Sequence, residues 1–340
     1  MDVKQIVFTK VNTAELLDTT IADELGEYEV LVKTNYSTIS CGTEKANISG
    51  STTVSWVSEA TTAIFPRYAG YSSSGIVEKV GSKVTKVAPG DSVAMIWSQH
   101  KSHNILHENG VVKFDPDKVD MQSAAICHIG TFPLAAIRKT KLEIGESALV
   151  MGLGILGLIA VKQLKVAGAT PIIAADPVEG RRKLALESGA DYAFDPTEEG
   201  FAKKVKEVTT GGVNVCIEVS GVGNGLNGAL DCMQRFGRVA LLGCTRDSHF
   251  EVDYYRKIHG PGITLVGAHT QARASAESSH GNYTAADDIR VQFKLLHMNR
   301  LCYTDIIHEV HNPQDCTEVY NRLVTDKNFP VCVQYKWDNI

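Results

Sequence analysis

The sequence predicts an α/β fold in which a β-rich, barrel-like domain is joined to a domain built on a doubly wound parallel sheet. The first observation is length, because 340 residues are long for a single hydrophobic core and suggest two domains. The second is a change of pattern near residue 129, where short alternating segments give way to apolar strands that alternate with helices. The third is a Gly-x-Gly-x-x-Gly run at 152–157, directly after an apolar strand.

Residues 1–128 are expected to form the β-rich domain. The segments "YEVLVKTNYSTIS", "SGIVEKV" and "SVAMIW" alternate apolar and polar residues with the period of two that is typical of strands. Glycine and proline separate such segments, notably at Pro89-Gly90-Asp91. Many short strands with turns between them favour a barrel-like arrangement.

Strands and helices alternate between residues 129 and 270, which predicts the parallel sheet. The expected strands are "SALVMGLG", "TPIIAADP", "VNVCIEVSG", "RVALLGC" and "ITLVGAH", and the expected helices are "ILGLIAVKQLKVAG", "GRRKLALESGA" and "LDCMQRFG". Residues 271–340 begin with a polar loop, continue into the helical "AADDIRVQFKLLHMNR" and end in the strand-like "PVCVQYKW". We expect this last segment to return to the β-rich domain.

Composition and charge exclude several classes of function. The net charge of −5, the pI near 6.1 and the lack of any Lys/Arg block argue against partners such as nucleic acid or an anionic membrane. No basic and apolar leader follows Met1, and the longest apolar run, 148–161, is interrupted by three glycines. Eight scattered cysteines without a Cys-x-x-Cys pair indicate reduced thiols. We therefore expect a cytoplasmic protein.

The strongest chemical signal is the glycine run together with an acidic residue at the end of the next strand. Gly152 allows the tight turn, Gly154 lets a pyrophosphate approach the backbone, and Gly157 permits close helix–strand packing. The helix start offers free N–H groups and a positive dipole end to phosphates. Asp176, nineteen residues after Gly157, is suited to bind a ribose diol and would repel a 2′-phosphate. The sequence therefore predicts NAD as cofactor, rather than NADP.

Two arginines follow Asp176 closely and leave an alternative open. Either Arg181 or Arg182 is suited to hold a 2′-phosphate, although an arginine on an amphipathic helix is more often a solvated side chain. We keep Arg181 among the expected cofactor-binding residues.

The chain resembles the medium-chain dehydrogenase/reductase superfamily over nearly all of its length. Besides the glycine run, the landmarks are "STISCGTE" at 37–44, "GYSSSGIVEKVGSKVTKVAPGDSV" at 70–93 and "IEVSG" at 217–221. It is most similar to the branch of threonine- and sorbitol-dehydrogenase-like proteins. The resemblance implies a GroES-like barrel domain, a Rossmann domain and a homodimer or homotetramer. It also implies that the cofactor site includes Ile155, Leu156, Ser220, Gly243 and Gly267.

The resemblance implies where a zinc ion would lie, and the residues there are unusual. Four closely spaced cysteines that hold a structural zinc in some members are absent from the region after the Gly-Asp-x-Val strand. The family's catalytic zinc takes a cysteine, a histidine from a G-H-E motif and a third residue near the domain junction. Cys41 fills the first place, whereas Tyr71 and Ser72 replace the histidine and the glutamate. His128 aligns with the third place, and Cys127 is the alternative.

Cys41 and His128 are two good ligands where a catalytic zinc needs three and an open position. A serine hydroxyl and a phenol are poor zinc ligands beside imidazole and thiolate. His100 or His103 is a possible third ligand, although histidines in such a loop more often pack or lie at the surface. We therefore expect no bound metal.

Without a Lewis acid, a neighbouring side chain has to move the substrate's proton. The candidates are Thr43, at the family's hydroxyl relay position, together with Tyr71 and His128, and Cys41 is expected close by. A histidine titrates near neutral pH and suits alcohol oxidation as a general base. Each candidate also has a structural interpretation, as a packed phenol, a core histidine or a relic of a lost zinc site.

The polar loop "HTQARASAESSHGNYT" begins where the parallel sheet should end. Ligands of such sheets bind beyond the carboxyl ends of the strands. His269, Arg273, Glu277 and Tyr283 are therefore candidates to bind a substrate with many hydroxyls or a negative charge, and an ordinary surface loop is the alternative.

The sequence thus predicts an NAD-dependent oxidoreductase that transfers a hydride between nicotinamide and a polyol, a sugar or a sugar-derived alcohol or ketone. Its partner would be a small alcohol or carbonyl compound. Two alternatives remain at this point: a zinc-free reductase of activated double bonds, and a nucleotide-binding protein without turnover.

Overall fold

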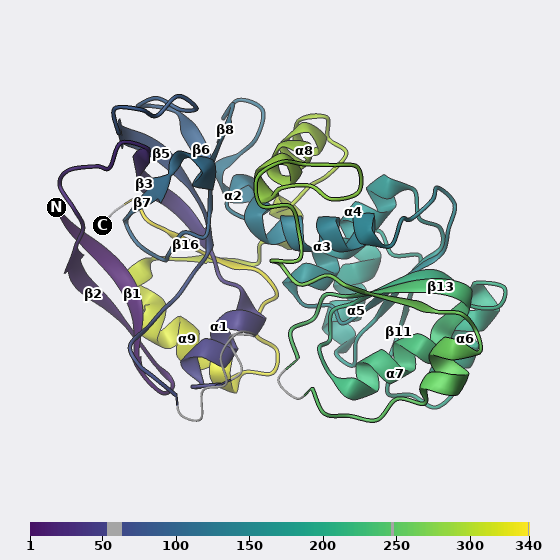
Figure 1. Ribbon diagram of the computed structural model, residues 1–340. Helices are drawn as coiled ribbons and strands as arrows, with labels where there is room; N and C mark the ends of the chain where they lie inside the picture. The colour runs from purple at the N-terminus through teal and green to yellow at the C-terminus, as the bar shows by residue number, and fades with distance from the viewer. Residues whose placement is uncertain (53–62, 246–247, 339) are drawn as a thin grey trace. The chain divides into compact units, whose positions relative to one another are not determined.

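The computed structural model describes residues 1–52, 63–245, 248–338 and 340. The chain divides into two compact units, one of Met1–Ile129 with Ile289–Ile340 and the other of Gly130–Asp288. The expected α/β fold, with one β-rich unit and one parallel-sheet unit, is confirmed (Figure 1). The segment 271–288, which the sequence analysis groups with the C-terminal return, belongs to the parallel-sheet unit.

The β-rich unit contains a seven-stranded sheet, in the order β15-β16-β3-β5-β6-β8 with β7 paired to β3, and a three-stranded sheet, β2-β1-β4. In the larger sheet, β3 pairs with β7 over its first half and with β16 over its second half. The strands are β1 (Asp2–Lys10), β2 (Thr13–Thr20), β3 (Glu29–Thr38), β4 (Arg67–Tyr68), β5 (Ser72–Val80), β6 (Ser92–Ile96), β7 (His103–His107), β8 (Val111–Phe114), β15 (Glu309–His311) and β16 (Val333–Lys336).

Two apolar clusters of the described residues contribute to the core of this unit. Valines of neighbouring strands pack inside the larger sheet, among them Val30, Val77 and Val93. In the second cluster, α1 (Cys41–Ile48) and α9 (Cys316–Thr325) pack with β1 and β16 around large side chains such as Phe8 and Trp337. Residues 289–340 therefore complete the core that the N-terminal residues begin.

The parallel-sheet unit has six strands in the order β11-β10-β9-β12-β13-β14, and every neighbouring pair is parallel. The chain runs outward from β9 to β11 and then returns to place β12 on the other side of β9, so the order reverses there. The strands are β9 (Ala148–Met151), β10 (Ile172–Ala175), β11 (Tyr192–Phe194), β12 (Val213–Glu218), β13 (Met233–Leu241) and β14 (Thr264–Gly267).

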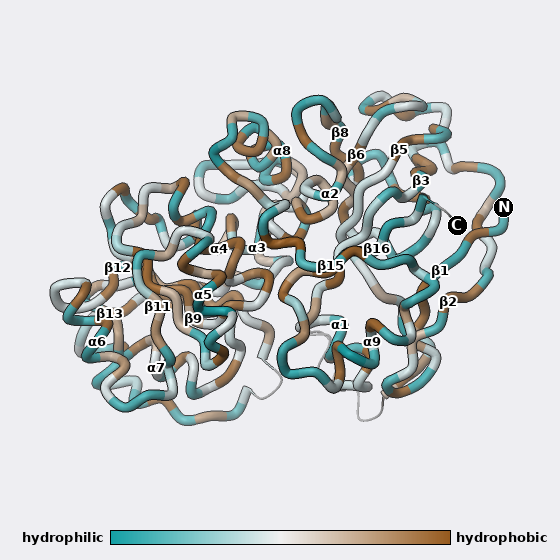
Figure 2. Tube along the Cα trace, turned by 180° about the vertical axis from the view of Figure 1, so that it is seen from behind, coloured by the Kyte–Doolittle hydropathy of each residue, from teal (hydrophilic) through white to brown (hydrophobic). Residues whose placement is uncertain are grey.

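Helices connect these strands: α4 (Ile155–Ala167), α5 (Glu179–Glu187), α6 (Phe201–Val208) and α7 (Gly223–Cys232). Parallel strands are usually covered on both faces and are therefore apolar throughout. β9 and β10 are buried at every position, and Figure 2 shows the hydrophobic colouring of this sheet and of α4. Two helices cross the division between the units, α3 (Cys127–Lys139) and α8 (Ala285–His297), and α2 (Met121–Ala124) precedes α3.

The helix expected at "LDCMQRFG" is wrong over its second half. α7 ends at Cys232 and β13 begins at Met233. Phe236 has a φ of +64°, a left-handed conformation that a right-handed helix cannot contain. The other helices and strands named in the sequence analysis are present, with ends that differ by a few residues.

Across the ranges that the structure describes, none of the helices is both long enough and apolar enough to cross a bilayer.

Candidate active site

The glycine run forms the turn between β9 and α4, as its spacing predicts. Gly152 has a φ of +98°, and a β-carbon there would lie 2.9 Å from the backbone nitrogen of Ser220. A β-carbon on Gly157 would lie 2.0 Å from the carbonyl oxygen of Gly152, so only glycine lets α4 begin this close to the turn. Gly154, in contrast, meets no described atom within 4 Å of its β-carbon position. That open space is what an approaching pyrophosphate requires.

Asp176 follows β10 and links this strand to the glycine turn. Its Oδ2 accepts a hydrogen bond from the backbone nitrogen of Leu153 at 2.9 Å, and its Oδ1 accepts one from Val178 at 2.9 Å. Arg181 places Nη1 3.6 Å from Oδ2, whereas Arg182 binds the backbone oxygen of Asp176 and the carboxylate of Asp195. Each carboxylate oxygen has a further lone pair with which to accept a ribose hydroxyl.

The other expected cofactor residues lie at the carboxyl ends of the strands or in the first turn of α4. Ile155 is buried there and Leu156 is half-buried. Ser220 donates its hydroxyl and its backbone N–H to Glu218, whose pKa is raised by burial. A β-carbon on Gly243 would lie 2.6 Å from the backbone nitrogen of Gly221, so the ends of β12 and β13 are in close contact. Gly267 ends β14, at the edge of the sheet.

Three aromatic rings gather in the β-rich unit and include two of the predicted catalytic residues. The rings of Tyr71 and His128 are 5.9 Å apart and perpendicular. Trp97 lies 5.5 Å from Tyr71 and 4.9 Å from His128. His128 is only 1% exposed, Tyr71 is half-buried and Trp97 is 51% exposed, so the tryptophan offers the largest surface of the three to solvent or a ligand.

Trp97 and Ser40 contact the predicted catalytic residues, and the sequence analysis names neither of them as a candidate. Trp97 follows β6 with a φ of +57°, an unusual backbone conformation for a bulky residue and one that tends to occur at functional sites. Ser40 directly precedes Cys41, and its hydroxyl accepts a hydrogen bond from the Tyr71 phenol. The position of Ser40 inside the "STISCGTE" landmark was a usable signal, but nothing in the sequence paired it with Tyr71.

Cys41 and Thr43 lie in the first turn of α1, and both are half-buried. The Cys41 sulfur is 3.7 Å from the carbonyl oxygen of Pro330 and 3.6 Å from that of Val331. Its thiol is therefore directed at the C-terminal segment of the same unit.

The histidines and the second cysteine considered as zinc ligands have other contacts. His100 is fully buried, with Nδ1 2.7 Å from the Ser37 hydroxyl and Nε2 3.2 Å from Glu44. His103 contacts Ser102 and Glu78, and burial lowers its pKa. Burial raises the pKa of Cys127 well above its usual value, which disfavours the thiolate that zinc requires.

Ser72, in the place of the family's glutamate, donates its hydroxyl to the backbone oxygen of Ala125 at 2.7 Å. Within the described ranges, no group of three or more His, Cys, Asp or Glu side chains is arranged to hold a metal ion. The donor set at Cys41, Tyr71, Ser72 and His128 does not fit a catalytic zinc, because only two of its members are good ligands.

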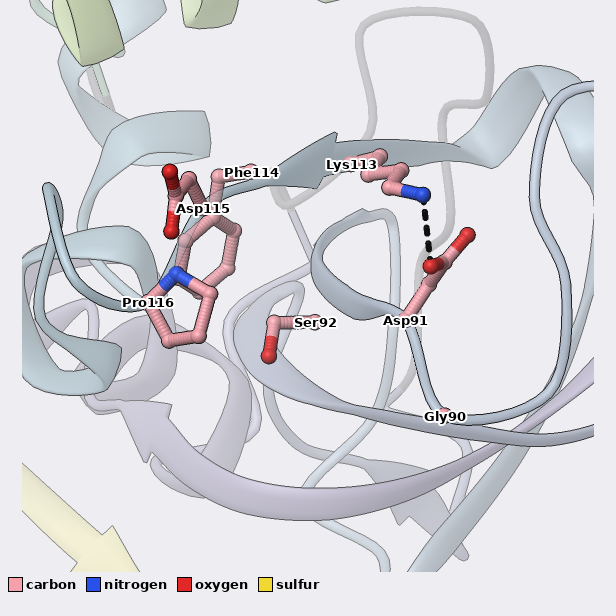
Figure 3. Close-up of a pocket in the computed structure, with 7 residues that line it drawn as sticks. All are labelled: Gly90, Asp91, Ser92, Lys113, Phe114, Asp115 and Pro116. Carbon is pink, nitrogen blue, oxygen red and sulfur yellow. Dashed lines mark ion pairs between the residues drawn. The ribbon is translucent and has the colours of Figure 1, made fainter.

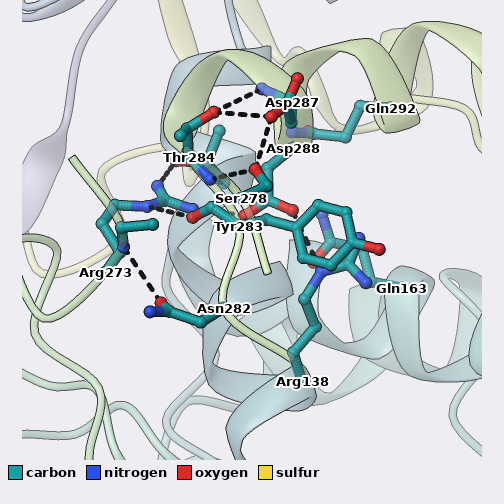
Figure 4. Close-up of polar contacts among 12 residues, drawn as sticks. Arg138, Gln163, Arg273, Ser278, Asn282, Tyr283, Thr284, Asp287, Asp288 and Gln292 are labelled. Carbon is teal, nitrogen blue, oxygen red and sulfur yellow. Dashed lines mark hydrogen bonds and ion pairs between the residues drawn. The ribbon is translucent and has the colours of Figure 1, made fainter. Parts of the chain in front are cut away.

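The polar loop after β14 is fastened inside the parallel-sheet unit. The Arg273 guanidinium binds the buried carboxylate of Asp288 and donates to the Thr131 hydroxyl at 2.7 Å. Asp288 also accepts from Arg138 at 3.1 Å, and the Arg138 guanidinium lies 3.9 Å from the centre of the Tyr283 ring (Figure 4). Arg273 and Tyr283 therefore hold the loop in place. His269 and Glu277, the other loop residues named in the sequence analysis, are half-buried and exposed, respectively.

A shallow pocket in the β-rich unit is lined by residues between Gly90 and Pro116, including Asp91, Lys113 and Phe114 (Figure 3). Lys113 and Asp91 form an ion pair at 2.6 Å and so neutralise each other. All seven lining residues differ from the predicted catalytic ones. We assign the aromatic cluster, and not this pocket, to the candidate site.

Two family models match the chain. Residues 26–114 match the alcohol dehydrogenase GroES-like domain, and residues 156–280 match the zinc-binding dehydrogenase domain. The L-threonine 3-dehydrogenase of Pyrococcus furiosus is 39% identical over 124 residues, which cover 36% of this chain and 35% of that enzyme. The D-guloside 3-dehydrogenase of Escherichia coli K12 is 32% identical over 173 residues, or 49% of each chain. The chain thus aligns with only a third to a half of these relatives' length.

Solved structures match the whole fold. A zinc-binding dehydrogenase-like protein of Sinorhizobium meliloti 1021, bound to NADP, superposes with a TM-score of 0.80 at 18% identity over 99% of both chains. An Escherichia coli CFT073 protein described as a short chain alcohol dehydrogenase, in complex with NADH, gives a TM-score of 0.82 at 18% identity, and the match covers 98% of this chain and 99% of that one. At such low identity the likeness shows the fold alone.

Proposed function

We propose, from the premise that the chain belongs to the medium-chain dehydrogenase/reductase superfamily, that it is an NAD-dependent oxidoreductase. The observation that carries the proposal is the glycine turn. Gly154 leaves open space for a pyrophosphate, while Gly152 and Gly157 have no room for a side chain. Bound there, the nicotinamide would supply or accept the hydride, and the chain's own residues would have to orient the substrate and move one proton.

The preference for NAD rests on Asp176. Its carboxylate is held at the end of β10 by two backbone N–H groups, and a ribose hydroxyl can still donate to it. A 2′-phosphate at the same ribose would meet a like charge within a few Å. Nη1 of Arg181 lies 3.6 Å from Oδ2 of Asp176. The positive charge of Arg181 weakens the repulsion of a 2′-phosphate but does not remove it, because that charge is already paired with the Asp176 carboxylate.

The proposed substrate is a polyol, a sugar or a sugar-derived alcohol or ketone. The similarity to a guloside dehydrogenase and a threonine dehydrogenase supports a small polar alcohol. The half-exposed Trp97 beside Tyr71 and His128 supports it too, because an aromatic face can pack on the C–H groups of a sugar while the phenol and the imidazole bind hydroxyls.

Proton transfer is assigned to Tyr71 and His128, with Thr43 and Cys41 as further contributors, and catalysis is proposed to proceed without zinc. The support is the chemistry of the side chains that would have to bind the metal. Tyr71 stands where the family has its histidine ligand, and its phenol donates a hydrogen bond to Ser40. The alternative third ligand, His100, has both ring nitrogens engaged by Ser37 and Glu44. A homodimer or homotetramer is proposed by family resemblance, and light scattering tests it.

A substrate screen tests the function. Purified protein is mixed with alcohols, polyols and sugars in the presence of NAD⁺, and with ketones and oxidised sugars in the presence of NADH, and the absorbance of NADH is followed. We expect turnover with polyols or sugar derivatives. Turnover with enones alone would instead identify a double-bond reductase. Tight cofactor binding with no turnover in any arm would identify a nucleotide-binding protein.

A further inference from the structure

We propose that Ser40 is a positioning residue for Tyr71 that serves both protonation states of the phenol. Its hydroxyl accepts a hydrogen bond from the neutral phenol and donates one to the phenolate that forms when Tyr71 gives its proton to the substrate. This inference rests on the proposed function, because it needs a carbonyl or alcohol substrate. It assigns a role to Ser40, which is not among the catalytic residues predicted from the sequence.

The geometry of the pair supports this role. The Tyr71 phenol donates to the Ser40 hydroxyl, and Ser40 is only 4% exposed while Tyr71 is half-buried. A serine hydroxyl carries one donor and two acceptor positions, and it turns about a single bond. It can therefore reverse the direction of the hydrogen bond without moving its oxygen.

Glu44 fixes the position of Ser40. The Ser40 backbone N–H donates to Oε1 of Glu44 at 2.9 Å, and the Glu44 N–H donates back to the Ser40 carbonyl oxygen at 2.8 Å. Glu44 is itself fully buried and accepts further hydrogen bonds from His100 and from the Tyr320 phenol. Burial and the Glu44 carboxylate raise the pKa of Tyr320 well above its usual value, so this phenol remains a donor.

Tyr71 is fixed from the same network. Gly70 has a φ of +86°, and a β-carbon there would lie 2.6 Å from the backbone nitrogen of His100, so the chain passes directly over His100 just before Tyr71. His100 in turn contacts Ser37, which also accepts a hydrogen bond from the Trp337 indole at 2.9 Å. Ser40 and Tyr71 are thus both held against one buried polar network, which explains how two side chains 31 residues apart keep their alignment.

The proposed step moves one hydride and one proton. In the reduction direction, a bound reduced nicotinamide would supply the hydride to the carbonyl carbon. The Tyr71 O–H, which donates to Ser40 in the resting state, would turn to the carbonyl oxygen and give up its proton there. The O–H bond of Tyr71 breaks, and its electron pair stays on the phenolate oxygen. Ser40 then donates to this anion, a charge-assisted hydrogen bond stronger than the one it replaces. A new proton from bulk solvent then restores the phenol of Tyr71, and alcohol oxidation runs the same steps in reverse.

A double-mutant cycle tests whether Ser40 acts through Tyr71. Ser40→Ala should lower kcat about 10- to 100-fold, the range expected for loss of a hydrogen bond to a charged group, with KM nearly unchanged. Ser40→Thr keeps the hydroxyl and should recover most of the rate. The double variant Ser40→Ala with Tyr71→Phe should be no slower than Tyr71→Phe alone. Independent, multiplying losses would overturn the proposal.

Ser73→Ala is the matched control. Ser73 is another buried serine of this unit, and its hydroxyl is 2.7 Å from that of Ser98, so the variant also loses one buried hydroxyl–hydroxyl hydrogen bond. It has no role in the proposed step and should leave kcat unchanged. A loss in Ser73→Ala as large as in Ser40→Ala would mean that general loosening of the unit, and not the Tyr71 contact, explains the effect.

A second measurement needs no substrate. Protein labelled with ¹³Cζ-tyrosine is titrated by NMR, and the Tyr71 resonance is assigned by its loss in Tyr71→Phe. The midpoint of the phenol's ionisation should move to higher pH in Ser40→Ala and stay in place in Ser73→Ala. An unchanged midpoint in Ser40→Ala overturns the inference. Absence of any nicotinamide-linked turnover in the wild type would instead overturn the proposed function, while this titration still decides whether Ser40 stabilises the phenolate.

Discussion

The glycine turn and the Ser40–Tyr71 pair are built from the sequence in opposite ways. In the turn, a β-carbon on Gly157 would lie 2.0 Å from the carbonyl oxygen of Gly152, so this contact joins residues only five positions apart. The pair joins residues 31 apart, and Glu44, which holds it, binds Tyr320 at a separation of 276 residues. The proposed nucleotide site thus depends largely on local glycine spacing, whereas the proposed proton-transfer pair is assembled by packing of distant segments.

The largest effect is expected from Gly157→Ala. Its β-carbon would lie 2.0 Å from a backbone oxygen, and backbone cannot move aside as a flexible side chain does. We expect destabilisation by about 3 kcal/mol or more, at or above the usual cost of overpacking, together with loss of cofactor binding. Thermal melts and a titration of NADH fluorescence measure both.

Gly154→Ala and Gly180→Ala sharpen this prediction. At either position a β-carbon meets no described atom within 4 Å. Gly154→Ala should therefore keep its melting temperature and lose cofactor affinity, because the methyl group occupies the space of the pyrophosphate. Gly180→Ala, inside α5, should gain about 0.5–1 kcal/mol of stability and bind the cofactor normally. A melting temperature for Gly157→Ala equal to that of Gly154→Ala would contradict the argument.

The features that could be predicted from the sequence are those that depend on local spacing, and the features that were missed depend on contacts between distant segments. The parallel sheet, the turn at 152–157 and the position of Asp176 directly after β10 were all predicted, because apolar runs and glycine spacing dictate local backbone geometry. Trp97 and Ser40 were not, because neither a φ of +57° nor a contact 31 residues away leaves a periodic signal. Arg273 was considered a substrate ligand, but its binding to the buried Asp288 depends on how α8 packs.

The next largest effect is expected from the aromatic cluster. Tyr71→Phe and His128→Ala should each lower kcat about 10²- to 10⁴-fold, the usual contribution of a general acid or base, and should leave cofactor affinity nearly unchanged. Steady-state kinetics and NADH titration separate the two quantities. If cofactor affinity fell as much as kcat, the aromatic cluster would stabilise the fold or bind the cofactor instead of transferring a proton. Its role would then no longer differ from that of the glycine turn.

A smaller effect is expected from Asp176→Ser, which removes the charge at the ribose position. The preference for NAD over NADP, expressed as a ratio of kcat/KM values, should fall about 10- to 100-fold, since each 1.4 kcal/mol of relieved repulsion is a factor of ten. Asp195→Ser is the matched control, because Asp195 also pairs with an arginine of α5 but follows β11. If the wild-type protein used NADP and NAD with equal efficiency, then Arg181, and not Asp176, would decide the cofactor preference.

The smallest expected effect is that of chelators, which should leave activity intact because we expect no stoichiometric zinc. Tyr71 and Ser72 replace both a metal ligand and the acidic residue that supports it, and loss of such a support alone typically costs about 10- to 100-fold in metal affinity. Cys41 faces two carbonyl oxygens, and turning His100 toward a metal would leave Glu44 without one of its buried donors. Elemental analysis of the purified protein decides the matter. About one zinc per chain, with activity lost on chelation and restored by zinc, would show that this unit has rebuilt a metal site from other ligands, and Tyr71 would then no longer need to supply the proton.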